Sequence, residues 1–226
     1  MRTTGLLPIC FAFLLTLGCT AQSPYFEGVI TYTIATTYKA DNPRHKVFYE
    51  NEKFGDTVRV YTNEAGFTKR TFPNADHYGS KAYYYDPRTN REFATYNFTD
   101  TVYVVDAGNT GVTDIRIQPC TSSSTESVLG YEVACLEMIA RDTFLEVTTT
   151  SRFYYPREGL AINHTTWKKN KDFLQGKMYR RSKSHWLRIE ADYGNYAYVM
   201  QAVSVDPRAV AKEEFVPPTG PEKMLQ

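Results

Sequence analysis

The chain has 226 residues and a formal net charge of +1 at pH 7, and 42% of its residues are hydrophobic. This balance of charge gives no basis for a nucleic-acid partner attracted through bulk positive charge. The length is sufficient for one domain with a sizeable core, and the aromatic content of 15% favours β-structure.

The first 21 residues have the three-part pattern of a secretory signal peptide. Arg2 supplies the positive start, Leu6 to Leu17 is an almost unbroken apolar run, and small residues follow it. The run is too short to span a bilayer as a helix of the mature protein. We therefore expect an exported protein with a single β-rich domain at residues 22–226. Because Arg2 is the only charged residue removed, the mature chain carries 25 basic and 25 acidic side chains.

Two cleavage sites compete at the end of this segment. Residues 15–19 resemble a bacterial lipobox, in which cleavage before Cys19 leaves that cysteine with a lipid anchor, although Thr16 and Leu17 depart from the usual lipobox residues. The alternative cleaves after Ala21, at a small-x-small site, and gives a protein without lipid. The choice decides between a membrane-tethered and a freely diffusing protein, since two acyl chains anchor stably.

Most of the mature chain is predicted to form short strands. Alternation over residues 26–38 places Phe26, Ile30, Tyr32 and Ile34 on one face. Further strand-like segments follow at intervals of about 8–12 residues. They are residues 57–62, 67–72, 81–85, 92–98, 100–105, 112–118, 133–141 and 144–155. This spacing predicts an antiparallel meander that closes or curls into a barrel or half-barrel.

Helix signals are few. Residues 51–54 can form one turn, and residues 166–184 can hold a short helix interrupted by Gly176. Residues 205–212 are the better candidate, because Asp206 can cap a helix there and Pro207 suits its first position.

Two cysteines remain in the mature domain once Cys10 leaves with the signal peptide and Cys19 is lipidated or removed. These are Cys120 and Cys135. In an oxidising envelope compartment we expect them to form a disulfide, and the alternative is two unpaired thiols. The absence of a CxxC motif and of a nearby histidine gives no support to zinc binding or redox catalysis.

The sequence shows no pattern typical of a catalytic or metal site. The four histidines stand in no HxH, HExxH or HxxE arrangement, and there is no GxSxG motif. Asp76 and His77 can form half of a metal or acid–base pair, but their proline-flanked loop is typical of a solvated turn. We therefore expect a protein that is not an enzyme and that needs no metal or other cofactor.

Several short motifs stand out along the chain. Residues 25–32 (YFEGVITY), 128–135 (VLGYEVAC) and 154–159 (YYPREG) resemble segments of small exported proteins of Bacteroidota-type bacteria. Residues 86–87 (DP), 202–205 (AVSV) and 214–217 (EFVP) resemble features of the lipoprotein-carrier (LolA/LolB-like) superfamily. The resemblance implies a mainly β (α+β) fold, with a curled antiparallel sheet that forms an incomplete barrel around an apolar cavity and a few short helices as a lid. It also implies a place in the periplasm or at the outer membrane, and it brings no catalytic residues.

Two sets of side chains are candidate binding sites. Aromatic residues that point inward from a curled sheet can line a ligand cavity, or they can fill an ordinary core. The candidates are Tyr32, Tyr84, Tyr155, Trp167 and Tyr198. A basic segment at residues 168–188 can contact an anionic membrane or partner, through residues that include Lys168, Lys169, Arg180 and Arg181. The alternative for that segment is two exposed strands joined by a solvated hairpin at residues 170–176, with its aromatic residues packed inward.

The resemblance therefore implies an envelope protein that binds a hydrophobic or lipidic small molecule without catalysis, and that is attached to a membrane if Cys19 is acylated. The alternative is a structural or interaction module of the envelope that binds a protein or glycan partner. An apolar pocket of about 300 Å³ or more favours the first function, and a filled core favours the second.

Overall fold

The computed structural model describes residues 23–39, 54–108, 112–121, 126–142, 147–171, 175–194 and 196–225. The predicted signal peptide, both cleavage sites and Cys19 lie outside these ranges, as does most of the helical turn predicted at residues 51–54. Within the described ranges, no helix is both long and apolar enough to cross a membrane.

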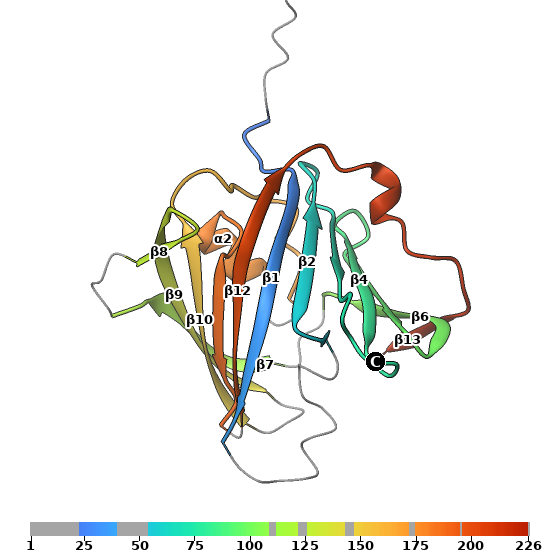
Figure 1. Ribbon diagram of the computed structural model, residues 1–226, viewed down its shortest axis with the longest axis horizontal. Helices are drawn as coiled ribbons and strands as arrows, with labels where there is room; N and C mark the ends of the chain where they lie inside the picture. The colour runs from blue at the N-terminus through green and yellow to red at the C-terminus, as the bar shows by residue number, and fades with distance from the viewer. Residues whose placement is uncertain are drawn as a thin grey trace, which may run out of the picture.

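One large, open, curled sheet contains all thirteen strands of the described residues (Figure 1). Its first six strands neighbour one another in chain order. They are β1 (Gly28–Tyr38), β2 (Thr57–Thr62), β3 (Thr68–Thr71), β4 (Ser80–Asp86), β5 (Arg91–Tyr96) and β6 (Thr99–Asp106). The others are β7 (Val112–Pro119), β8 (Glu126–Val128), β9 (Tyr131–Asp142), β10 (Val147–Pro156), β11 (Arg188–Asp192), β12 (Tyr196–Pro207) and β13 (Glu222–Leu225).

The strand order explains why the sheet curls without closing. It runs β13-β6-β5-β4-β3-β2-β1-β12-β11-β10-β9-β7, and β8 pairs with β9. Neighbouring strands are antiparallel except for β13 and β6, which are parallel. Because the described strands at the two ends of this order do not pair with each other, the barrel is incomplete. The predicted mainly β fold with a curled antiparallel sheet is therefore confirmed.

The predicted strands between residues 26 and 155 are present, with ends shifted by a few residues. The predicted alternation is confirmed, since Phe26, just before β1, and Ile30, Tyr32 and Ile34 within it are all buried. Strands β8, β11, β12 and β13 were not predicted as strands of the sheet. Their segments are short or interrupted by polar residues, and β12 is a strand because it pairs with β1 and β11.

The helix predicted at residues 205–212 is wrong. Strand β12 continues through Pro207, which lies opposite Gly28 of β1. Within this part of the chain only a 3₁₀ turn, η3 (Lys212–Phe215), is helical. The capping pattern of Asp206 and Pro207 is a local preference, whereas pairing with β1 satisfies the backbone hydrogen bonds of a whole strand.

Helix α2 (Gln175–Ser182) lies within the segment where a short helix was predicted. Gly176 does not interrupt it. A Cβ atom at this position would lie 2.2 Å from the carbonyl oxygen of Asn170 and 2.3 Å from that of Trp167. Glycine is therefore required here because the preceding turn packs its backbone directly against the start of the helix.

A disulfide joins Cys120, just after β7, to Cys135 in β9, as predicted, with Cα atoms 5.3 Å apart. The amide of Cys120 also donates a hydrogen bond to the carbonyl of Cys135 at 3.1 Å. When the unreduced protein is digested, we expect the peptides that carry these two cysteines to remain joined and to separate on reduction, as followed by mass spectrometry. Free thiols at both positions in the unreduced protein would contradict this pairing.

Candidate functional site

Aromatic side chains occupy the inner side of the curled sheet, which is defined here as the face against which α2 packs. Trp167 stacks on Tyr85 with ring centroids 4.2 Å apart and contacts Tyr179 at 4.6 Å. Tyr179 stacks on Trp186 at 4.3 Å, and Trp186 contacts Phe153 of β10 at 4.8 Å. All five residues are buried. This aromatic column therefore links β4, α2 and β10 in one packed core.

Four of the five predicted ligand-binding residues belong to the core on the inner side. Trp167 is fully buried, and Tyr155 and Tyr198 pack against the same cluster. Tyr32 donates a hydrogen bond from its hydroxyl to the carbonyl of Trp186 at 2.6 Å. Burial raises the pKa of Tyr32 far above its ordinary value, and Tyr179 adds a smaller effect in the same direction. The Tyr32 hydroxyl therefore stays protonated in the folded protein and keeps donating this hydrogen bond within the core.

The fifth residue, Tyr84, lies on the opposite, outer face of the sheet. Its neighbour Tyr85 belongs to the inner core, and successive side chains of a strand point to opposite faces. Tyr84 lies under the ammonium group of Lys69, 5.6 Å from its ring centroid, and Lys69 forms an ion pair with Glu214 of η3 at 2.6 Å. The structure therefore separates Tyr84 from the other four candidates, and a ligand-binding role for these residues stays a prediction.

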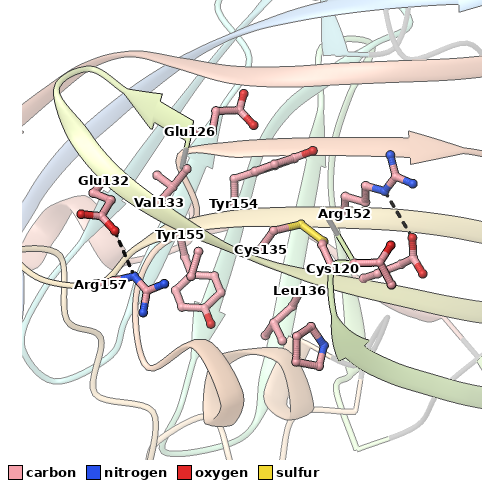
Figure 2. Close-up of a pocket in the computed structure, with 14 residues that line it drawn as sticks. Cys120, Glu126, Glu132, Val133, Cys135, Leu136, Arg152, Tyr154, Tyr155 and Arg157 are labelled. Carbon is pink, nitrogen blue, oxygen red and sulfur yellow. Dashed lines mark hydrogen bonds and ion pairs between the residues drawn. A yellow bond between two sulfur atoms is a disulfide. The ribbon is translucent and has the colours of Figure 1, made fainter. Parts of the chain in front are cut away.

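A pocket with a volume of about 470 Å³ lies beside the Cys120–Cys135 disulfide (Figure 2). We call it the disulfide pocket. Its walls come from the end of β7, the start of β8, and facing parts of β9 and β10. The apolar part of its lining includes Pro119, Val133, Ala134, Leu136 and the disulfide itself. Of the five predicted ligand-binding residues, only Tyr155 lines it.

Three acidic and two basic side chains also line the disulfide pocket, and all of them are ion-paired. Glu132 pairs with Arg157 at 3.5 Å, and Glu137 pairs with Arg152 at 3.2 Å. Glu126 pairs at 2.6 Å with Arg188, which lies outside the lining. The charges of the pocket are therefore compensated by protein partners without a ligand.

Tyr154 supplies a neutral hydrogen-bonding group at the same pocket. Burial, with a further effect of the Glu190 carboxylate, raises the pKa of Tyr154. Its hydroxyl therefore stays protonated at neutral pH and donates to Glu190 at 3.1 Å. The guanidinium of Arg188 lies over the Tyr154 ring, 5.3 Å from its centroid. These contacts hold the ring in place as a flat wall.

No group of three or more histidine, cysteine, aspartate or glutamate side chains in the described ranges could hold a metal ion. Asp76 and His77 are exposed turn residues. The disulfide pocket offers apolar side chains, the phenols of Tyr154 and Tyr155 and charges that are already paired, which suits the capture of a molecule with both apolar and polar parts.

Sequence reasoning did not find the disulfide pocket, because its residues form no motif along the chain. Strand register brings them together: Cys135 lies opposite Tyr154, and Glu137 lies opposite Arg152. The predicted disulfide was the one signal that pointed to this place.

The basic segment does not form the predicted hairpin. Lys168 and Lys169 lie in a turn, and Arg180 and Arg181 lie on α2, so the hairpin interpretation is wrong. The prediction that the aromatic residues of this segment pack inward is confirmed, because Trp167, Tyr179 and Trp186 are buried while the four basic residues are exposed. A contact of this segment with an anionic partner stays a prediction.

Comparisons with known proteins give no family assignment. No protein-family model matches the chain, and no curated protein sequence matches it. A crystal structure of the lipoprotein LppX from Mycobacterium tuberculosis aligns with 81% of this chain and 89% of that chain, at 10% sequence identity and a TM-score of 0.38. Similarity at this level carries no functional argument, so membership of the lipoprotein-carrier superfamily stays a prediction.

Proposed function

We propose that this chain is a non-catalytic binding protein of the cell envelope, and that the disulfide pocket takes a small amphipathic molecule. The observation that carries the proposal is the pocket itself. Its volume of about 470 Å³ lies within the range of about 300–1,000 Å³ that is usual for ligand sites. Its lining combines apolar side chains, such as Pro119 and Leu136, with two phenols and five charged groups that are ion-paired.

The charges at the edge define which ligands fit. Because the five charged lining residues are all paired, a ligand with a net charge would have to break one of these ion pairs or leave its own charge uncompensated. A neutral or zwitterionic head group can instead hydrogen-bond to paired groups such as Glu132 and Arg157. The apolar part of the ligand would cover Ala134 and Leu136, which share one face of β9, and burial of that surface would supply the affinity.

The proposed location rests on the first 21 residues, which have the pattern of a secretory signal peptide. The protein would then act in the periplasm or at the outer membrane. A lipid anchor at Cys19 would hold it at a membrane, whereas cleavage after Ala21 would release it. The disulfide is consistent with an oxidising compartment of this kind.

The proposal can be tested with a short-chain lysophosphatidylcholine, which is zwitterionic and has one acyl chain, by isothermal titration calorimetry below its critical micelle concentration. We expect Ala134→Trp to weaken binding at least about tenfold, because the added ring occupies the volume that the acyl chain needs. Ala35→Trp is the matched control, since Ala35 is an exposed alanine of β1 outside the pocket, and it should bind as the wild type does.

Two results would overturn the proposal: wild-type protein that does not bind the probe, or equal affinities of Ala134→Trp and wild type. Arg157→Glu provides a second variant if Ala134→Trp does not fold. It places a second acidic group beside Glu132 at an exposed position, and repulsion there should weaken binding of the phosphate in the head group.

A second candidate function is the predicted interaction module, and one observation favours it. Tyr78 is 75% exposed and Phe98 is 47% exposed, with ring centroids 6.2 Å apart. Exposed aromatic rings of this kind provide a face for a glycan or a protein partner. Wild-type protein that ignores the amphipathic probe would make this the better candidate.

A further inference from the structure

The segment that forms the turn before α2, and α2 itself, presents an unusual run of unpaired positive charge. Seven basic side chains in this segment are exposed, and none forms an ion pair with a residue that the structure describes; Asp172 lies outside the described residues. They are Lys168, Lys169, Lys171, Lys177, Arg180, Arg181 and Lys183. Some arginines elsewhere on the surface, such as Arg152, Arg157 and Arg208, have acidic partners, whereas Arg59 and Arg91 are exposed without an ion pair among the described residues.

Three of these cations surround one hollow. A depression of about 320 Å³ between α2 and β7 is lined by Ile117, Lys177, Arg180 and Arg181, with no acidic residue among them. The three basic residues stand at positions i, i+3 and i+4 of α2 and therefore share one face of the helix. Their mutual repulsion is unfavourable unless solvent or an anion compensates it.

The cations are held in place by the protein. Arg181 donates from Nη1 to the carbonyl of Ile117 at 2.6 Å, and Arg180 donates from Nε to the carbonyl of Gly176 at 3.2 Å. Each guanidinium has five N–H donors, so most of them remain available. The other side of α2 is buried through Met178 and Tyr179, which makes the helix a rigid platform.

Stabilisation of the helix alone does not account for this pattern. Basic residues in the last turn interact favourably with the helix dipole, which accounts for Arg180 and Arg181. It does not account for Lys177 in the first turn, nor for Lys168, Lys169 and Lys171 before the helix begins. A distributed anionic partner accounts for all of them.

We propose that this basic segment docks on an anionic phospholipid surface, with a lipid phosphate in the hollow formed by Lys177, Arg180 and Arg181. Guanidinium groups bind phosphate oxygens through paired hydrogen bonds. A membrane is the source that fits, because one free phosphate would use the three cations of the hollow and leave the other four without a partner. A lipid surface offers phosphates to all seven.

The test measures binding of the mature protein, carrying Cys19→Ala so that no acyl chain tethers it, to sedimented vesicles. Vesicles of phosphatidylglycerol mixed with phosphatidylcholine are compared with phosphatidylcholine alone. Each basic side chain near an anionic bilayer raises affinity about fivefold. We therefore expect the triple variant K177Q/R180Q/R181Q to bind the anionic vesicles about 100-fold more weakly, and added salt to weaken the wild type.

The matched control is R59Q/K81Q/R91Q, which removes the same charge from exposed positions away from α2. Its affinity for the anionic vesicles should stay within about threefold of that of wild type if binding depends on where the positive charges lie and not only on the net charge of the protein. Equal losses in the two triple variants would overturn the proposal, as would a wild type that does not prefer anionic vesicles. Binding of soluble glycerol phosphate as strong as that of vesicles would also overturn it, in favour of a free phosphate ligand. Lys177→Glu alone replaces the triple variant if that variant does not fold.

Discussion

Replacing Trp167 with alanine is expected to lower the free energy of unfolding by about 3–5 kcal/mol. The indole is 0% exposed, and it stacks on Tyr85 and contacts Tyr179 at the centre of the aromatic column. Its removal would leave a large cavity between β4 and α2. The surrounding rings are also packed against Trp186 and Phe153, so they can collapse into that cavity only in part.

Urea unfolding of the two proteins, followed by circular dichroism, would measure the difference. Tyr78→Ala is the control, because Tyr78 is 75% exposed, and its loss should change the free energy of unfolding by less than about 0.5 kcal/mol. Similar losses from the two substitutions would show that Trp167 is not part of a packed core. If Trp167→Ala were as stable as the wild type, the interior around Trp167 would have to be loosely packed. It would then have room for the apolar ligand that the sequence predicts.

Acidification is expected to destabilise the fold through His185. This ring is 2% exposed and lies against Phe26, with ring centroids 5.6 Å apart. Burial, and to a smaller extent the positive charge of Arg70, lowers the pKa of His185 from 6.5 to about 4. Between these values the unfolded chain binds a proton that the folded protein does not. The contribution of His185 to the free energy of unfolding should therefore fall by about 3 kcal/mol in total as the pH drops from above 6.5 to below about 4.

Chemical unfolding at a series of pH values between 7 and 4 would measure this effect. His185→Gln cannot be protonated, so its stability should change less over this interval than that of the wild type by about the amount assigned to His185. His77→Gln controls for the loss of a histidine, since His77 is exposed in a turn. The assignment is wrong if His185→Gln and wild type lose the same stability between pH 7 and 4.

The sequence alone was sufficient for the parts of this protein that local patterns specify. The alternation of Phe26, Ile30, Tyr32 and Ile34 predicted the buried face of β1, because side chains alternate along any strand. The segment at residues 57–62 was predicted with the bounds of β2. The pairing of Cys120 with Cys135 followed from the number of cysteines left in the mature chain and the expected compartment. In each case the information lies in a short stretch or in a count.

Only the tertiary structure decided where those elements meet. Asp206 and Pro207 have the local pattern of a helix start, yet pairing with β1 makes them part of β12. Tyr84 and Tyr85 are adjacent in sequence, and only the packing of Trp167 shows which of them faces the core. The disulfide pocket depends on a register that sets Cys135 opposite Tyr154, and the basic hollow depends on α2 lying beside Ile117. Strand pairing and side-chain packing join residues far apart in the chain, and no local periodicity encodes which partners they find.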